Sequence, residues 1–490
     1  MKTEADLEDL VRGVVAQVVA GQAEAPSLRL PVHAQPRSAT APAPSDGAGV
    51  IHVSATGGNG LFSTVDDAVG AARMAQGKLA AEGIERRKAY IGAIRAAGIA
   101  NAERLARSAY EETGLGRFRD KVGKNVFAAE ATLGVEDLEA TAFSGDHGLA
   151  VEDSLPWGVV ASITPINSPS AFIINHAITM LGGGNAVVFN THPGCRSTSM
   201  ATVELLNQAV VEEGGPDNLM TGVVEPTLDT AKGLVTHAGV DMLVITGGAA
   251  LIKDAFATNK RVIAAGPGNP TTVIDETADP KRAASEVFKG ASFENCILCI
   301  GEKTCIVAET AAPDFLAALD PLPVRKLDPR ETDQVFQTVI DTSGHHPMTR
   351  REFVGKDAEV LLQAAGLSAA KPVGLLVAEV DREHPLVWME QFVPFLPVVR
   401  ARDADDAIDL GIAAEGHNHH TAMIYSNRPD RVERFAREAE TVICVVNGNS
   451  LRGLGFEGEG YPGFTIGTLT CEGLTSTRHY VRARRVSHTR

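Results

Sequence analysis

Three short apolar segments, each followed by a stretch of helical composition, constrain the fold of this chain more than any other feature. Strands are predicted over 157–165, 185–190 and 241–246, and helices over 170–184 and 198–213. Strands joined by crossover helices lie parallel in one sheet, and such sheets bind ligands at the carboxyl ends of their strands. The predicted fold class is therefore α/β, with a doubly wound parallel sheet.

The pattern continues on both sides of these segments. Helices are predicted over 65–79 and 85–110, and a second α/β stretch begins near Arg261 and runs to about residue 430. The chain has 490 residues, of which 44% are apolar and 22% charged. That is the composition of a globular protein, and this length predicts two or three domains.

The net charge argues against two classes of partner. The chain has 45 Lys and Arg against 61 Asp and Glu, which gives a formal charge of −16. An acidic surface repels phosphate backbones and anionic headgroups, so neither a nucleic acid nor a membrane surface is expected as a partner. An exposed edge strand is the favoured interpretation of the one basic run, which consists of Arg478, Arg482, Arg484, Arg485 and Arg490.

Three features predict a cytoplasmic protein. No apolar run approaches the roughly 18 residues that cross a bilayer, and the N-terminus lacks the basic and apolar pattern of a secretory signal. Six cysteines in a chain of this length form no disulfide framework, which fits a reducing compartment.

The first 48 residues differ from the rest. Residues 1–20 are predicted to form an amphipathic helix, and 21–48 a disordered linker rich in Pro and Ala. The apolar stripe of the helix has i, i+3, i+4 spacing and consists of Leu7, Leu10, Val11, Val14, Val15, Val18 and Val19. Docking on an apolar groove of another protein is favoured over packing on the chain's own body, because the linker is long.

Glycine motifs give one weak nucleotide signal. A G-x-G-x-x-G match at Gly453, Gly455 and Gly458 is predicted to be a loop, because no helix follows to hold a pyrophosphate. Gly247 and Gly248 pass from a strand to a helix and form a better phosphate cradle.

Two cysteines stand close together in KGASFENCILCIGEK (289–303). Cys296 and Cys299 form a C-x-x-C, which is compatible with a redox pair or half of a zinc site. A structural zinc site needs a second ligand pair, and the histidines at 417, 419 and 420 are far away in the sequence. A single nucleophilic cysteine is the favoured interpretation, and the histidines are predicted to lie in a loop that leads into a buried strand.

Five segments resemble the aldehyde dehydrogenase superfamily, and specifically its CoA-acylating branch, the propionaldehyde and acetaldehyde dehydrogenases of bacterial microcompartments. They are PWGVVASITPIN (156–167), ITGG (245–248), GASFENCILC (290–299), MEQFVPFLPVV (389–399) and a long C-terminal segment (447–478). The resemblance extends from about Gly60 to the C-terminus. It implies a nucleotide-binding domain, an α/β catalytic domain and an oligomerisation arm.

The resemblance also implies which residues act. Cys299, six residues after Phe293, is the nucleophile, and the Asn167 side chain with the Cys299 backbone N–H holds the oxyanion. No metal is implied. The residues implied to bind the nucleotide cofactor are Thr164, Pro165, Ile166, His192, Thr246, Gly247, Gly248, Glu390 and Phe392.

The sequence departs from the family pattern at two places. The family's ribose-binding K-P-S-E is His192-Pro193-Gly194-Cys195 here, so the usual marker for NAD or NADP is missing; NAD is favoured. Glu294 stands where the branch commonly has aspartate.

The acyl acceptor is predicted from a missing carboxylate. Hydrolytic relatives have the glutamate of E-L-G-G-K, and the matching segment here is AAGPGNP (264–270). Without a general base water attacks a thioester slowly, since proton abstraction contributes about 10²–10⁴ in rate. Coenzyme A is therefore the expected acceptor, and short aldehydes of two to four carbons are the implied substrates. A hydrolytic aldehyde dehydrogenase and a non-catalytic scaffold with the same fold remain as alternatives.

The resemblance and the sequence pattern predict the domain boundaries and the partners. A nucleotide-binding domain is expected over 49–258 and 431–470, a catalytic domain over 259–430, and an oligomerisation strand over 471–490 that pairs with 140–152. A homodimer or tetramer is expected. Residues 1–20 resemble the encapsulation peptides of microcompartment enzymes, so a shell protein is the expected partner and a bacterial microcompartment in the cytoplasm the expected location.

Overall fold

The computed structural model describes residues 59–344 and 346–489, which lie in one compact unit. The docking helix and the linker predicted for 1–48 lie outside the described residues. Within the described part, no helix is both long enough and apolar enough to span a bilayer.

The first sheet has six parallel strands in the order β1-β6-β5-β4-β7-β8. They are β1 (Leu61–Phe62), β6 (Met220–Val223), β5 (Ala186–Thr191), β4 (Val159–Thr164), β7 (Met242–Thr246) and β8 (Arg261–Ala265). Its helices are α2 (Val65–Ala80), α3 (Ile84–Ala100), α4 (Ala102–Thr113), α5 (Phe118–Ala131), α6 (Pro169–Gly182), α7 (Arg196–Glu212), α8 (Leu228–Thr236) and α9 (Ala249–Phe256). One apolar core joins this sheet to all of these helices except α4, and the doubly wound fold predicted from the sequence is confirmed.

One predicted helix is divided. The helix expected over 85–110 is two helices, α3 and α4, which meet at Asn101. Asn101 has φ −109° and ψ 8°, outside the helical range, and its side-chain amide donates to the Ala97 carbonyl at 2.9 Å. Asparagine competes in this way for backbone partners, which favours helix ends over helix interiors.

The second sheet has seven parallel strands in the order β11-β14-β15-β10-β9-β16-β17. They are β11 (Val324–Leu327), β14 (Leu375–Glu379), β15 (Phe395–Ala401), β10 (Thr304–Ala308), β9 (Thr271–Ile274), β16 (Thr421–Tyr425) and β17 (Ile443–Val446). The accompanying helices are α10 (Pro280–Ser292), α11 (Ala312–Ala318), α12 (Pro329–Val339), α13 (Ala358–Ala364), α14 (Ala404–Glu415) and α15 (Pro429–Ala439). Cys305 and Val307 of β10 pack in one core and Ile306 in another, as expected for a strand covered on both faces.

The strand pairing differs from the predicted domain boundaries at two places. β8 pairs with β7 and so extends the first sheet, although it falls within the predicted catalytic domain, 259–430. β17 pairs with β16 and so belongs to the second sheet, although it falls within 431–470. The backbone groups of each segment form hydrogen bonds with the strand at the edge of one sheet. The position of a segment along the chain does not indicate which of the two sheets it joins.

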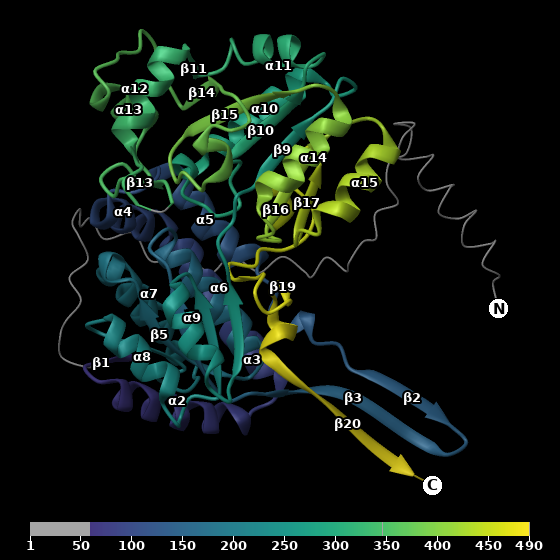
Figure 1. Ribbon diagram of the computed structural model, residues 1–490. Helices are drawn as coiled ribbons and strands as arrows, with labels where there is room; N and C mark the ends of the chain where they lie inside the picture. Colours follow the sequence, from purple (N-terminus) through teal and green to yellow (C-terminus); the bar gives the residue numbers. More distant parts are fainter. Residues whose placement is uncertain (1–58, 345, 490) are drawn as a thin grey trace. The chain divides into compact units, whose positions relative to one another are not determined.

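A separate antiparallel sheet joins two distant segments. β3 (Gly148–Pro156) lies between β2 (Thr141–Gly145) and β20 (Val481–Thr489), as Figure 1 shows. The predicted pairing of 140–152 with the C-terminal strand is present, and Arg484 and Arg485 form ion pairs with Asp153 and Glu152 across it. Almost all residues of these strands are at least partly exposed.

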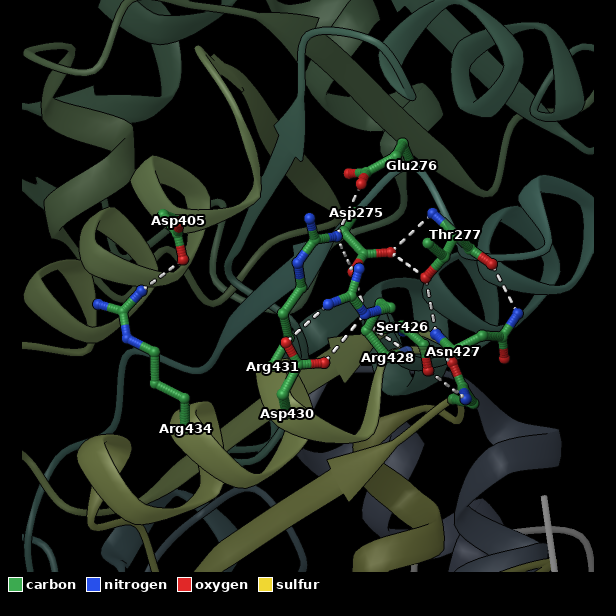
Figure 2. A network of polar contacts seen from close by, with 11 residues as sticks. Asp275, Glu276, Thr277, Asp405, Ser426, Asn427, Arg428, Asp430, Arg431 and Arg434 are labelled. Atoms are coloured by element: carbon green, nitrogen blue, oxygen red, sulfur yellow. Dashed lines mark hydrogen bonds and ion pairs between the residues drawn. The ribbon is translucent and has the colours of Figure 1, made fainter. Parts of the chain in front are cut away.

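A polar network closes the carboxyl end of the second sheet around Asp275, which follows β9 (Figure 2). The Asp275 side chain is 1% exposed, and it accepts hydrogen bonds from Ser426 Oγ at 2.6 Å and Arg431 Nη1 at 2.8 Å. The Thr277 backbone N–H and hydroxyl donate to it at 2.8 and 2.6 Å. Because the chain's own side chains satisfy this carboxylate, the network ties β9, β16 and α15 together.

Candidate active site

The predicted site residues come from opposite ends of the two sheets. In the first sheet they follow the carboxyl ends of β4, β5 and β7, as the fold class predicts. In the second sheet they precede the strands: Cys299 precedes β10, and Glu390 and Phe392 precede β15. The first sheet thus presents the predicted residues at its carboxyl end, as expected from the sequence. The second sheet presents them at its amino end, and its carboxyl end at β9 and β16 is tied by the Asp275 network.

A small apolar cavity of about 70 Å³ lies at Cys299. Its polar lining residues are Lys124, Asn167, Ser168, Thr246 and Cys299. Its other lining residues are Phe127, Phe172, Phe293, Leu298, Ile300, Leu451, Leu454, Phe456, Gly463, Phe464 and Ile466. A cavity of this size and composition fits a short aliphatic molecule with one polar group beside the thiol and the amide.

The two cysteines of the C-x-x-C have different surroundings. Cys299 is partly exposed and lines the cavity. Cys296 is 2% exposed, and its Sγ lies 3.2 Å from Lys303 Nζ. The pKa of the Cys299 thiol is raised to about 12, mainly by burial and also by the Glu390 carboxylate, against the opposing effect of the Lys303 ammonium. Only Cys299 is placed to attack a molecule in the cavity.

Asn167 is close to the nucleophile loop and retains unused hydrogen-bonding capacity. Its Nδ2 donates to the Ile297 carbonyl at 3.3 Å, near the upper limit for a hydrogen bond. Its Oδ1 is buried without a partner among the described residues. An oxyanion at Cys299 would accept from the Nδ2 hydrogens, and the one bond that Nδ2 donates here is long. The side chain therefore suits the role that the resemblance implies.

The predicted nucleotide-binding residues of the first sheet lie side by side at the carboxyl ends of its inner strands β4, β5 and β7. Thr164 is opposite Thr191, the residue before His192, and β4 also pairs with β7, which ends at Thr246. A Cβ built on Gly194 would come within 2.8 Å of Ile166 Cδ1, so the segments that hold Ile166 and His192 are in contact. Pro165 is half-buried between Thr164 and Ile166.

The Gly247-Gly248 turn joins the carboxyl end of β7 to the first residue of α9. Gly247 and Gly248 have φ of 85° and 77°, both in the region that favours glycine, and both are exposed. The first turn of α9 leaves backbone N–H groups free for an anion. Thr246 lines the cavity, and its hydroxyl is 3.0 Å from that of Thr465.

Glu390 and Phe392, the other two residues predicted to bind the nucleotide, both lie near Lys303. Glu390 Oε1 and Thr164 Oγ1 are both buried without a partner among the described residues, so both can bond sugar or amide groups. Burial raises the pKa of Glu390 to about 7, against the opposing effects of the Lys303 ammonium and the Gly268 N–H. The Phe392 ring has its centroid 5.1 Å from Lys303 Nζ. A pyridine nucleotide thus fits the donors and acceptors present.

Three residues of the site were missed in the sequence. His420 is fully buried, its Nε2 has no partner among the described residues, and burial lowers its pKa to about 4. A Cβ on Gly268 would lie 2.9 Å from both the His420 ring and the Cys299 carbonyl, so the histidine packs near the nucleophile loop. As predicted, it ends a loop that leads into β16, and its Nδ1 is 2.9 Å from Thr421 Oγ1. The other two are the buried lysines Lys124 and Lys303. No motif marks a role for either, although Lys303 ends the segment 289–303.

Comparison with known proteins agrees with this geometry. The aldehyde dehydrogenase family model matches residues 34–468. The chain is 43% identical to the acetylating acetaldehyde dehydrogenase EutE of Salmonella typhimurium, over 87% of this chain and 91% of the relative.

Two solved structures are similar. One is the Rhodopseudomonas palustris propionaldehyde dehydrogenase with bound CoA and an acylated cysteine, at 38% identity and a TM-score of 0.86, covering 88% of this chain and 98% of that one. The other is a propionaldehyde dehydrogenase from the fucose utilisation microcompartment of Clostridium phytofermentans, at 37% identity and a TM-score of 0.86, covering 88% and 99%. The resemblance found in the sequence is thereby confirmed, and the chain belongs to the aldehyde dehydrogenase family.

Proposed function

We propose that the enzyme oxidises a short aliphatic aldehyde, acetaldehyde or propionaldehyde, to its acyl-CoA with NAD as oxidant. The observation that carries the choice of acceptor is the lining of the cavity at Cys299: among the described residues, it includes no Asp or Glu. Gly268, in the segment that replaces the glutamate of hydrolytic relatives, lies next to the Cys299 carbonyl instead. Without a base to activate water, a thiol is the better acceptor. The CoA and the acylated cysteine of the similar R. palustris enzyme support the same choice.

The first half of the reaction follows from the placed groups. The Cys299 thiolate attacks the aldehyde carbonyl and forms a C–S bond, and the carbonyl electron pair moves to oxygen. The Asn167 amide and the Cys299 backbone N–H hold that oxyanion. Thr246–Gly248, His192 and Glu390 would hold a pyridine nucleotide, which would supply the oxidation by taking a hydride from the reacting carbon. Cys299 would then carry the acyl group as a thioester.

The second half transfers the acyl group. The CoA thiolate attacks the thioester carbonyl, the bond to Cys299 Sγ breaks, and the Cys299 thiolate is regenerated. Apolar side chains surround the thioester and limit the access of water. NAD remains the proposed oxidant in preference to NADP. The family's ribose-binding lysine is replaced by the exposed His192 at the end of β5, so the usual marker for this choice is missing.

Steady-state assays test the acceptor, the oxidant and the aldehyde together. Aldehydes of two to five carbons are offered with and without CoA, and with NAD or NADP in turn. We expect NADH formation that depends on CoA and yields acyl-CoA. We also expect a fall of roughly tenfold in kcat/KM from three to five carbons, because overfilling a packed pocket costs about 1–3 kcal/mol. Fast NADH formation without CoA that gives free acid would instead identify a hydrolytic enzyme, and an alkylation-competent Cys299 without turnover would identify a scaffold.

The three-stranded sheet is the proposed oligomerisation arm of a homodimer or tetramer. Three large apolar side chains of this sheet are exposed: Phe143 on β2 (53%), Leu149 on β3 (41%) and Val486 on β20 (39%). Apolar side chains exposed together on one element are typical of an interaction surface. Exposed strand edges of this kind are commonly covered by another chain. Light scattering on the full chain and on a variant that lacks 481–490 measures this directly, and a monomeric full chain would refute it.

Residues 1–20 are proposed to bind a microcompartment shell protein. The apolar stripe and the long linker support this, as does a similar enzyme that comes from a microcompartment. Deletion of residues 1–20 should leave kcat and KM unchanged but abolish co-purification with shells, because the residues proposed to act or to bind the nucleotide lie between 164 and 392. Unchanged co-purification would contradict the proposal.

A further inference from the structure

The loop before Cys299 has an unusual backbone. Glu294, Asn295 and Cys296 are consecutive residues with φ of 52°, 54° and 61°. None of them is glycine, and residues with a Cβ populate this left-handed region sparsely. The loop therefore keeps its conformation only because the surrounding structure holds it.

The beginning of α5 supplies most of that support. The Glu294 carboxylate is fully buried and accepts hydrogen bonds from the Arg117 backbone N–H at 2.9 Å and from Nζ of Lys121 and Lys124 at 2.8 Å each. The Glu294 backbone N–H donates to the Asp120 carboxylate at 2.8 Å. Two ammonium groups around one carboxylate stabilise its charge, which agrees with a Glu294 pKa below its usual range despite burial.

Lys124 differs from Lys121 in what else it holds. Its Nζ also donates to Ser168 Oγ at 2.8 Å and to the Asn167 backbone carbonyl at 3.1 Å. A lysine ammonium has three N–H donors, so Lys124 uses one for the nucleophile loop and two for the Asn167–Ser168 turn. Among the hydrogen bonds of the described residues, Lys121 Nζ donates to Glu294 alone.

We propose that Lys124 is a positioning residue that sets the distance between Cys299 and the Asn167 amide by tying the loop of one to the turn of the other. The inference rests on the proposed roles of Cys299 and Asn167. Lys124 is 6% exposed, and in such surroundings charged hydrogen bonds are strong and geometrically exacting. A misplacement of about 1 Å in a catalytic group lowers the rate by roughly 10²-fold.

Lys124→Met and Lys121→Met form a matched pair that tests the proposal. Each removes one ammonium from the same carboxylate, and the two lysines are similarly buried, at 6% and 3% exposure. The measurements are the rate constant of the NADH burst without CoA, the KM of the aldehyde, the Tm, and the rate of alkylation of Cys299 by iodoacetamide. The burst isolates the step that forms the oxyanion, whereas alkylation needs the thiol but no oxyanion.

Both variants should lower the Tm by similar amounts. Lys124→Met should slow the burst by about 10²-fold with little change in KM or in the alkylation rate, because the amide is displaced while the thiol stays in place. Lys121→Met should slow the burst by less than about fivefold, since the Lys124 bridge remains. Ser168→Ala removes one bond of that bridge and leaves both lysines on Glu294; it should slow the burst by roughly fivefold.

Equal slowing of the burst in the two lysine variants would overturn the proposal, because the lysines would then only stabilise the loop. A parallel loss of alkylation in Lys124→Met would do the same. If Lys124→Met does not fold, Ser168→Ala decides, and an unchanged burst in that variant rejects the bridge. Failure of the wild type to form acyl-CoA would reject the proposed function instead, so the two failures are distinguishable.

Discussion

Replacing Cys299 with alanine should lower kcat by roughly 10⁴-fold or more, whereas Cys296→Ala should retain most of the activity. Loss of a nucleophile removes the covalent path altogether. Cys299 lines the cavity, while the Cys296 thiol is buried against Lys303 and faces no substrate space. The measurement is NADH formation at saturating aldehyde and CoA, and Cys296→Ala serves as the matched control because it removes a thiol from the same loop.

The pH dependence of Cys299 alkylation gives an independent check. Burial raises the pKa of this thiol to about 12, so thiolate is the minor form throughout the neutral range. Below the pKa the thiolate fraction rises tenfold per pH unit, and alkylation of the free enzyme by iodoacetamide should rise about tenfold from pH 7 to pH 8 without a plateau. A plateau of the alkylation rate below pH 8 would contradict the raised pKa of Cys299. An equal loss of activity in the Cys299→Ala and Cys296→Ala variants would contradict the choice of Cys299 as the nucleophile.

Asn167→Ala should lower kcat by about 10²–10³-fold with little change in the KM of the aldehyde. Removal of one oxyanion donor has this cost in other enzymes, because the donor acts on charge that appears only in the transition state. The Asn167 amide is the only side-chain amide lining the cavity among the described residues. The burst of NADH without CoA should slow in the same proportion, since the oxyanion forms before CoA takes part.

A second asparagine provides the control. Asn175 on α6 is also buried, but its amide donates to Thr132 Oγ1 and the Pro462 carbonyl and lies outside the cavity lining. Asn175→Ala should lower the Tm while kcat falls far less. If Asn167→Ala raised KM and left kcat unchanged, the amide would bind the ground state, and its role as an oxyanion donor would have to be abandoned.

The site depends on two sheets that present opposite ends to each other. The first sheet contributes residues after β4, β5 and β7, and the second contributes residues before β10, β15 and β16. In the second sheet the end that usually binds ligands is tied at β9 and β16 by the Asp275 network, and its amino end is free to carry the nucleophile loop (Figure 2). A cavity at the carboxyl end of one sheet and the amino end of the other is lined by loop residues from both sheets, and the core of each sheet is unaffected.

The site residues that were predicted lie in recognisable sequence motifs, and those that were missed do not. Cys299, Asn167 and the Gly247-Gly248 turn stand in local motifs, and the last two follow strands that the hydrophobic pattern locates. Lys124, Lys303 and His420 have no such motif. Lys124 and His420 are buried by contacts with segments that are distant along the chain. The Lys303 ammonium is held by Cys296 within its own loop and lies near the distant Phe392 ring.

The sequence by itself predicted the α/β class, the positions of the first strands along the chain, the family and, through the family resemblance, Cys299 rather than Cys296 as the nucleophile, because periodicity and short motifs are local properties of the chain. The tertiary structure decided where the sheets divide the chain, that the second sheet presents its amino end to the site, and that Lys124 lies between Glu294 and Asn167. These features depend on strand pairing and on the burial of charge over long sequence separations. Coulomb and hydrogen-bond energies depend on the distance between groups in space, whereas a single sequence gives only their separation along the chain.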